Sequence, residues 1–272
     1  MARASTSRLA ITQALGISLK HLNRRSKLEI KDKQLKEQIE AAHKLHPAYG
    51  HRRLAWHLGI NKKRILRVMH KFGIKPPRRK IRHHYCTKSV SYCPFTNLIK
   101  NIIPTAANQI WVSDASYFWF AGRFWYLATI EDIFTRQIIG FAFGRHHDSR
   151  LVLSALKMAI LITGTVPLFF HSDQGAEFMA EAVVNFLQSK GVKISVSDKA
   201  SPWQNGYKES FFGRFKDEFG DFNRFNSVAE LMEEIYSQIK YYNQDRIHTA
   251  LKMPPAVYAV KVSENHLPKR GT

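Results

Sequence analysis

Cysteine is nearly absent from this 272-residue chain, which contains only Cys86 and Cys93. Two cysteines give no disulfide framework and are typical of a protein from a reducing cytoplasm. With the neighbouring His83 and His84 they form neither a C-x₂-C nor a Cys₂His₂ spacing, so a basic linker that contains cysteine is favoured over a zinc site.

Long apolar runs are also missing. No stretch has the 18 or more apolar residues of a membrane span, and the residues from Met1 to Ser5 do not open a secretory signal. We therefore expect a cytoplasmic protein without a membrane partner.

Acidic residues are scarce in one part of the chain only. The chain has 42 Lys and Arg against 21 Asp and Glu, a net charge of +21. Residues 1–100 contain 24 of the basic residues and 4 of the acidic ones, whereas residues 101–272 contain 18 and 17. This asymmetry predicts a polyanion-binding N-terminal region attached to a nearly neutral body. A basic region kept for solubility, or an RNA-binding protein, would also explain the charge.

The basic region is predicted to form short helices separated by turns. Residues 8–25 favour a helix-turn-helix with Ser18 as an N-cap, and residues 52–71 favour a second helical pair around the turn Gly59–Asn61. Such a unit can place a basic helix in a major groove, although a helical hairpin with a solvated basic face is the alternative. The candidate DNA-contacting residues here are Arg24, Arg25, Arg52, Arg53, Lys62, Lys63, Arg64 and Arg67.

Residues 75–105 are predicted to be a linker. Pro76 and Pro77 open it, and basic residues follow that can track a phosphate backbone. The candidate contacts in this segment are Arg78, Arg79 and Lys80.

From Gln109 onward the pattern is typical of an α/β domain. Three strands are predicted in a meander, with Gly122 in a hairpin turn, followed by alternating helices and strands. This order indicates a ribonuclease-H-like fold, whose mixed sheet is covered by helices on both faces. The predicted strands are 110–120, 123–130, 137–143, 166–170 and 192–196, and the predicted helices are 149–161, 176–190, the helix carrying Glu209, and 227–243. Pro254 and Pro255 are predicted to end the regular structure.

Three carboxylates stand out in this domain. Asp114 ends an apolar, aromatic run, Asp173 ends a second predicted strand, and Glu209 begins a helical pattern. A turn or a helix cap would explain any one of them alone. Together, acids from two strands and a helix suit two Mg²⁺ ions, with Mn²⁺ as a substitute, because such ions take oxygen ligands and act in pairs in phosphodiester chemistry.

The order Asp, Asp, Glu, with 35 residues between the last two, resembles the DDE signature of transposases and retroviral integrases. The segments HSDQGAEF (171–178), SPWQNGYKESFFGRFKDE (201–218) and YYNQDRIHTALKMPPAVY (241–258) resemble the integrase core of bacterial insertion-sequence transposases of the IS-three family. The similarity runs from about Gln109 to Tyr258, with a weaker continuation upstream.

This resemblance implies a DNA transposase, a polynucleotidyl transferase whose catalytic and metal-binding residues are Asp114, Asp173 and Glu209. Strand cleavage at the element ends would free a 3′-hydroxyl, which then attacks another phosphodiester. The loop before Glu209 could hold the DNA end by stacking and phosphate contact through Trp203, Asn205 and Lys208. Asp132 is expected to orient the fold.

Three further expectations concern partners. The resemblance implies a homo-oligomer on DNA, a location at the bacterial nucleoid, and fusion or complex formation with a helix-turn-helix and leucine-zipper protein from an upstream frame.

His171 is expected to be a core histidine, whereas Arg246 and His248 could contact DNA or brace the fold.

The predicted organisation is a helix-turn-helix-like region (1–74), a basic linker (75–105), a ribonuclease-H-like catalytic core (106–260) and a tail (261–272). Two other functions are compatible with this organisation. One is an integrase-fold protein that binds DNA without catalysis, and the other is an RNase-H-type nuclease.

Overall fold

The computed structural model describes residues 12–14, 16, 27–77, 93–198 and 206–266, and the side chains of residues 27, 206–210 and 265–266 lie outside that description. The chain forms two compact units, Met1–Pro77 and Arg78–Thr272, each of which is described by itself. Within the described residues, the helices are too short or too polar to span a membrane.

The described part of the N-terminal unit is helical. It contains α3 (Lys27–Leu45), α4 (His51–Leu58) and α5 (Lys62–Lys71). α4 ends at Gly59, which adopts the left-handed conformation (φ 65°), and the Asn61 side chain caps α5 by accepting from the Lys63 N–H at 2.9 Å. The helical pair predicted for residues 52–71 is therefore confirmed. The pair predicted for residues 8–25 lies almost entirely outside the described residues.

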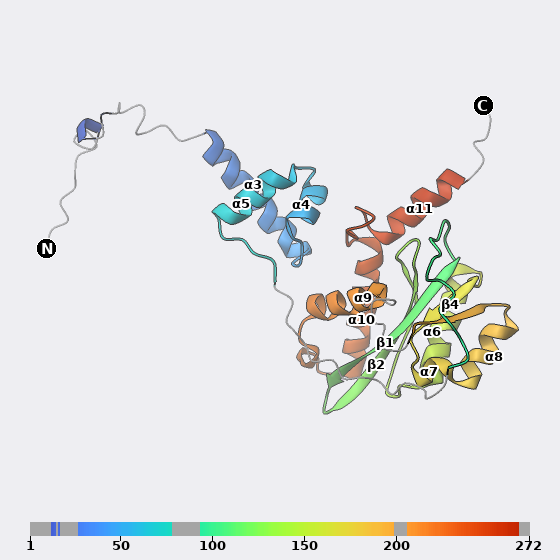
Figure 1. Cartoon of the computed structure of the whole chain (residues 1–272). Helices are drawn as coiled ribbons and strands as arrows, with labels where there is room; N and C mark the ends of the chain where they lie inside the picture. The colour runs from blue at the N-terminus through green and yellow to red at the C-terminus, as the bar shows by residue number, and fades with distance from the viewer. Residues whose placement is uncertain (1–11, 15, 17–26, 78–92, 199–205, 267–272) are drawn as a thin grey trace. The chain divides into compact units, whose positions relative to one another are not determined.

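The second unit is built on a five-stranded mixed sheet with the strand order β3-β2-β1-β4-β5 (Figure 1). β1, β2 and β3 pair antiparallel, whereas β4 and β5 extend the sheet in parallel from β1. The strands are β1 (Ile110–Phe120), β2 (Arg123–Asp132), β3 (Ile138–Gly144), β4 (Phe169–Ser172) and β5 (Lys193–Val196).

A two-residue turn joins β1 to β2. Ala121 and Gly122 both have positive φ, 50° and 75°, as a type I′ hairpin requires. The predicted hairpin is confirmed, and the strained position of Ala121 is a cost that the long paired strands offset.

Helices cover both faces of this sheet, as predicted (Figure 1). One apolar core joins Trp111 and Phe170 to the helices α6, α7 and α8, and a second, rich in phenylalanine, joins Phe118 and Phe120 to α9 and α10. The helices of this unit are α6 (Ser149–Thr163), α7 (Ala176–Met179), α8 (Glu181–Ser189), α9 (Gly206–Phe219), α10 (Val228–Gln244) and α11 (Pro255–His266), with a 3₁₀ turn η2 (Phe222–Arg224).

Three predicted boundaries are wrong. Residues 176–190 form two helices instead of one, because Ala180 is extended (φ −62°, ψ 138°) between α7 and α8. Pro255 begins α11 instead of ending the regular structure, since proline lacks only an N–H that the first helical turn leaves unpaired. The end of the predicted linker packs on the core: the Thr96 carbonyl accepts from Val196 N–H at 3.1 Å, and the Leu98 N–H donates to Ser195 Oγ at 2.9 Å.

Candidate active site

The parallel pairing of β1 with β4 aligns the two candidate aspartates. Ile110 pairs with Phe169 and Val112 with His171, and Asp114 and Asp173 each follow two residues after this last pair, Asp173 just beyond the end of β4. Asp114 therefore lies inside β1, with six residues of the strand beyond it, and not at its end.

The two aspartates also share a face of the sheet. Side chains alternate along a strand, so Asp114 is on the side of Ile110 and Val112, and Asp173 on the side of Phe169. Ile110, Val112 and Phe169 pack in one cluster, which identifies these as the same side. The fold thus brings together two acids that are 59 positions apart in the sequence.

Helix α9, which contains Glu209, covers this same face. Its Phe211, Phe215 and Phe219 lie in the core that contains Phe118 of β1, and Phe118 is on the Asp114 side by alternation. The ammonium group of Lys216 donates to the Tyr117 carbonyl at 3.0 Å, which fixes α9 against β1.

For Glu209, the third acid, the structure describes only the backbone, which lies in α9. The side chains of Glu209 and Lys208 lie outside the described residues, as do Trp203 and Asn205 entirely. Among the side chains that the structure describes, no three His, Cys, Asp or Glu residues gather as a metal site. A triad therefore stays a prediction, supported by two aligned aspartates and a helix on their side.

The electrostatic setting of Asp173 disfavours its negative charge. Burial raises the pKa of this carboxyl, the Gly175 N–H that donates to Asp173 Oδ1 at 3.0 Å lowers it, and the nearby Glu177 carboxylate raises it again. His147 lowers it to a smaller extent. A bound cation would relieve this cost, which fits the hard oxygen chemistry expected of a divalent metal ligand.

His147 and Glu177 are part of this site and were not predicted from the sequence. His147 Nε2 lies 3.0 Å from Glu177 Oε1, and both side chains are largely buried. Glu177 lies in the HSDQGAEF segment that also contains Asp173, so its position in that segment could have indicated a role in the site. The sequence around His147 contains no comparable signal.

Asp132 and His171 have the structural roles expected of them. Asp132 is buried and accepts from the N–H groups of Asn108, Phe134 and Thr135, which fixes the turn after β2. His171 is fully buried, its ring nitrogens lie 2.9 and 3.0 Å from the hydroxyls of Ser195 and Ser197, and burial lowers its pKa to about 4.

Arg246 braces the fold. Its side chain is 1% exposed, and its Nε and Nη2 donate to the Glu218 carboxylate of α9 at 2.6 to 2.9 Å. Of the two roles left open by the sequence, the structure supports the one in which Arg246 holds the helix that carries Glu209. His248 lies in an isolated bridge with Met253.

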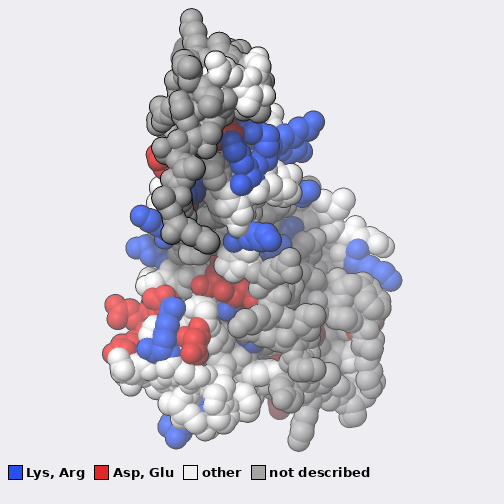
Figure 2. Space-filling model, turned by 90° about the vertical axis from the view of Figure 1, so that its left-hand side faces the viewer, with Lys and Arg blue, Asp and Glu red and all other residues white. Residues whose placement is uncertain are grey.

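Most of the predicted basic contacts that the structure describes in the N-terminal unit are exposed. Figure 2 shows Lys and Arg side chains on the surface of the described residues, and Arg52, Lys62, Lys63 and Arg64 are all exposed. Arg53 is half-buried, with its guanidinium over the Tyr49 ring. Arg24, Arg25, Arg78, Arg79 and Lys80 lie outside the described residues.

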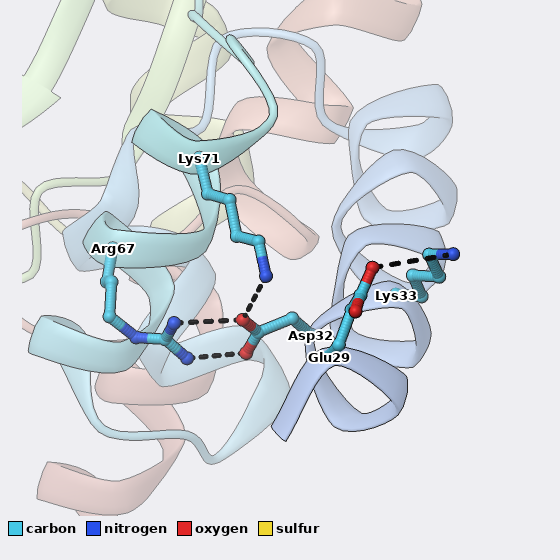
Figure 3. Close-up of polar contacts among 5 residues, drawn as sticks. All are labelled: Glu29, Asp32, Lys33, Arg67 and Lys71. Carbon is cyan, nitrogen blue, oxygen red and sulfur yellow. Dashed lines mark hydrogen bonds and ion pairs between the residues drawn. The ribbon is translucent and has the colours of Figure 1, made fainter. Parts of the chain in front are cut away.

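Among the candidate DNA contacts, Arg67 has a buried acidic partner. Its guanidinium donates to both oxygens of Asp32 in α3, at 2.9 and 2.5 Å, and Lys71 donates to the same carboxylate at 3.0 Å (Figure 3). Asp32 is completely buried, and Arg67 first and then Lys71 lower its pKa to about 2 despite the burial. This pairing joins α3 to α5, and a DNA contact of Arg67 stays a prediction.

Comparison with known proteins places the site in a family. Residues 104–202 match an integrase core domain family and residues 190–255 match a second family of the same description. The chain is 33% identical over 239 residues to the transposase for insertion sequence element IS904 of Lactococcus lactis, with 84% of this chain and 94% of the relative aligned. It is 32% identical over 241 residues to the insertion element IS600 uncharacterized 31 kDa protein of Shigella sonnei, covering 85% and 88%.

A solved structure supports the fold. The chain superposes with a TM-score of 0.52 and 17% identity on a chain of the simian T-cell lymphotropic virus intasome in complex with PP2A regulatory subunit B56 gamma, covering 85% of this chain and 76% of that one.

Proposed function

The chain belongs to the family of bacterial insertion-sequence transposases with an integrase-like catalytic core, and we propose that Asp114, Asp173 and Glu209 are the carboxylates that carry out its chemistry. It is a DNA transposase; the cleavage of element ends and the transfer of the freed 3′-hydroxyl to another phosphodiester are the reactions that we assign to this site. The observation that carries the assignment is the β1–β4 pairing, after which Asp114 and Asp173 follow on neighbouring segments, with α9, the helix that contains Glu209, packed on the face of β1 that carries Asp114.

The donor set fits a divalent cation. Asp114 and Asp173 provide carboxylate oxygens, and burial, followed by the nearby Glu177 carboxylate, raises the pKa of Asp173, a cost that a bound cation would offset. We propose that these two residues and Glu209 hold two Mg²⁺ ions, with Mn²⁺ as a substitute. When bound, such ions supply Lewis-acid stabilisation of the charge that develops on the phosphate and lower the pKa of an attacking water or hydroxyl.

The fold of the chain positions the acidic side chains. β1 and β4 fix the two aspartates through main-chain pairing, and the Gly175 N–H orients the Asp173 carboxylate. Lys216 and the Arg246–Glu218 pair anchor α9, so the backbone of Glu209 is held from two sides. Preorganised ligands of this kind avoid the cost of rearrangement during the reaction.

DNA is the proposed partner of the exposed basic residues. Arg52, Arg53, Lys62, Lys63 and Arg64 lie on α4 and α5, and we propose that they contact phosphates together with Arg67 and the basic residues outside the described part. Action at the nucleoid, assembly of two or more copies on DNA and cooperation with an upstream-frame protein belong to the same proposal. So does the DNA-end contact by Trp203, Asn205 and Lys208.

A cleavage and joining assay tests this function. Linear duplexes that end in the DNA flanking the native gene are incubated with the purified chain and Mg²⁺, with and without any upstream-frame protein. Asp173→Asn and Glu209→Gln are expected to abolish both products. The matched controls are Asp221→Asn and Glu233→Gln, two exposed acids of the same unit, which should keep full activity.

Three results would contradict the proposal. Full activity of Asp173→Asn would remove that residue from the site. Cleavage of an RNA–DNA hybrid in place of duplex DNA would indicate an RNase-H-type nuclease. Tight DNA binding without cleavage in any arm would indicate a non-catalytic integrase-fold protein.

A further inference from the structure

Two side chains near Asp173, those of His147 and Glu177, are not among the three candidate acids. His147 is in the connection between β3 and α6, and Glu177 is in α7, four residues after Asp173. Their side chains are 19% and 6% exposed, and His147 Nε2 lies 3.0 Å from Glu177 Oε1. Glu177 first, and Asp173 and Asp114 to a smaller extent, raise the pKa of His147, which is consistent with a position near both aspartates.

The sheet fixes the imidazole ring. His147 stacks on Tyr126 of β2, with ring centroids 5.0 Å apart and ring planes 9° from parallel. Tyr126 pairs with Tyr117 of β1, three residues beyond Asp114 on that strand. The ring of His147 therefore packs on β2, the strand that pairs with the Asp114 strand β1.

The carboxylate of Glu177 in turn contacts the turn after β4. It lies against Gly175 so closely that a Cβ at this position would overlap both of its oxygens and its carboxyl carbon. The N–H of the same Gly175 donates to Asp173 Oδ1 at 3.0 Å. A Cβ at position 175 would therefore displace the Glu177 carboxylate, which contacts the residue that orients the Asp173 carboxylate.

We propose that His147 is a positioning residue for the metal-binding carboxylates: it holds Glu177, which holds the Gly175 turn, so that Asp173 is kept beside Asp114. The pair also limits the local negative charge, because Glu177 alone would add a buried carboxylate next to Asp173. Orientation of ligands by such outer contacts commonly changes metal affinity by 10- to 100-fold. This inference rests on the proposed function of the site.

The test is Mn²⁺ binding by the purified full-length chain, measured by calorimetry and by the electron paramagnetic resonance signal of free Mn²⁺. His147→Phe keeps a flat ring for stacking on Tyr126 and loses the nitrogen that faces Glu177. His147→Gln keeps an amide N–H that can reach the carboxylate. His146→Phe is the matched control, since His146 is the exposed neighbour.

We expect His147→Phe to raise the Mn²⁺ dissociation constant about tenfold, His147→Gln to recover most of that loss, and His146→Phe to bind like the wild type. Wild-type affinity in His147→Phe would overturn the proposal, as would equal losses in His147→Phe and His147→Gln. If His147→Phe does not fold, as judged by thermal unfolding, Glu177→Gln takes its place, and wild-type affinity there would overturn the proposal.

The wild-type chain separates this inference from the function on which it rests. A wild-type chain that neither binds Mn²⁺ nor cleaves DNA would contradict the proposed function. A wild-type chain that does both, beside variants of His147 and Glu177 that also do both normally, would contradict this inference alone.

Discussion

Two aspartates, Asp32 in the N-terminal unit and Asp173 in the second unit, have opposite surroundings. Asp32 in α3 accepts from Arg67 and Lys71, and these cations lower its pKa to about 2 (Figure 3). Asp173 Oδ1 accepts a hydrogen bond from the Gly175 N–H. Burial, and then the nearby Glu177 carboxylate, raise the pKa of Asp173. No Lys or Arg of the described residues forms an ion pair with it.

We propose that the difference separates a structural acid from a metal-binding one. A buried carboxylate with two fixed cations is fully compensated and joins two helices. Asp173 has no such pair of cations, burial raises its pKa, and we propose that a metal ion from solution is its partner. Variants at Asp173, at the Arg246–Glu218 pair, at Asp32 and on the basic face of α5 test this contrast.

The largest expected effect is on catalysis. Asp173→Asn should reduce end cleavage by about 10³-fold, since metal-ion stabilisation of a transition state is worth several kcal/mol. The thermal unfolding midpoint should stay the same or rise, because the raised pKa shows that the ionised carboxyl opposes folding. A large drop in the midpoint together with normal cleavage would make Asp173 the structural acid.

Glu218 in the second unit is a third carboxylate, and like Asp32 it is paired with a basic side chain, that of Arg246. Arg246→Met leaves Glu218 without its guanidinium partner and should lower the free energy of unfolding by about 3–5 kcal/mol. Urea titration measures this loss. The double variant Arg246→Met with Glu218→Met should recover much of it, and no recovery would mean that packing, not charge, dominates at this pair.

Asp32→Asn should destabilise the N-terminal unit while leaving cleavage chemistry intact. Amide hydrogen exchange of α3 and α5 measures the loss, and Glu29→Gln is the control, because the Glu29–Lys33 pair is exposed and 3.9 Å long (Figure 3). Equal protection of α3 in Asp32→Asn and in the wild type would contradict a structural role.

The same residue predicts a pH dependence. The folded pKa of Asp32, about 2, is below its ordinary value of 3.8, so its stabilising contribution is complete above pH 3.8 and is lost as the pH falls towards 2. Asp32→Asn should remove this loss from the acid unfolding curve of the N-terminal unit, whereas an unchanged curve would contradict the assignment.

The smallest expected effect concerns basic residues without a fixed acidic partner among the described residues. Replacing Lys62, Lys63 and Arg64 together by alanine should reduce the slope of log affinity against log salt by about 3, about 1 for each phosphate contact. Filter binding over a salt series measures the slope. Lys44→Ala on α3 is the matched control, and an unchanged slope in the triple variant would remove α5 from the DNA interface.

Local signals in the sequence were sufficient for much of the fold. Gly122 marked the hairpin, and Gly59 with Asn61 marked the turn between α4 and α5. The break at Ala180 had no such signal, since alanine favours helix.

The site could be predicted only in part. The three acids stood out by order and spacing, but the alignment of Asp114 with Asp173 depends on pairing between strands that are distant in the sequence. His147 was missed because its role comes from contacts with Tyr126 and Glu177, neither of which is near it in the chain.

The most direct test of the contrast is a crystal structure of the chain with Mn²⁺, in which anomalous scattering locates the metal. The account predicts Mn²⁺ bound by oxygens of both Asp114 and Asp173, and no metal at Asp32. Mn²⁺ that is absent from the two aspartates at saturating concentration, or bound at Asp32 instead, would contradict it.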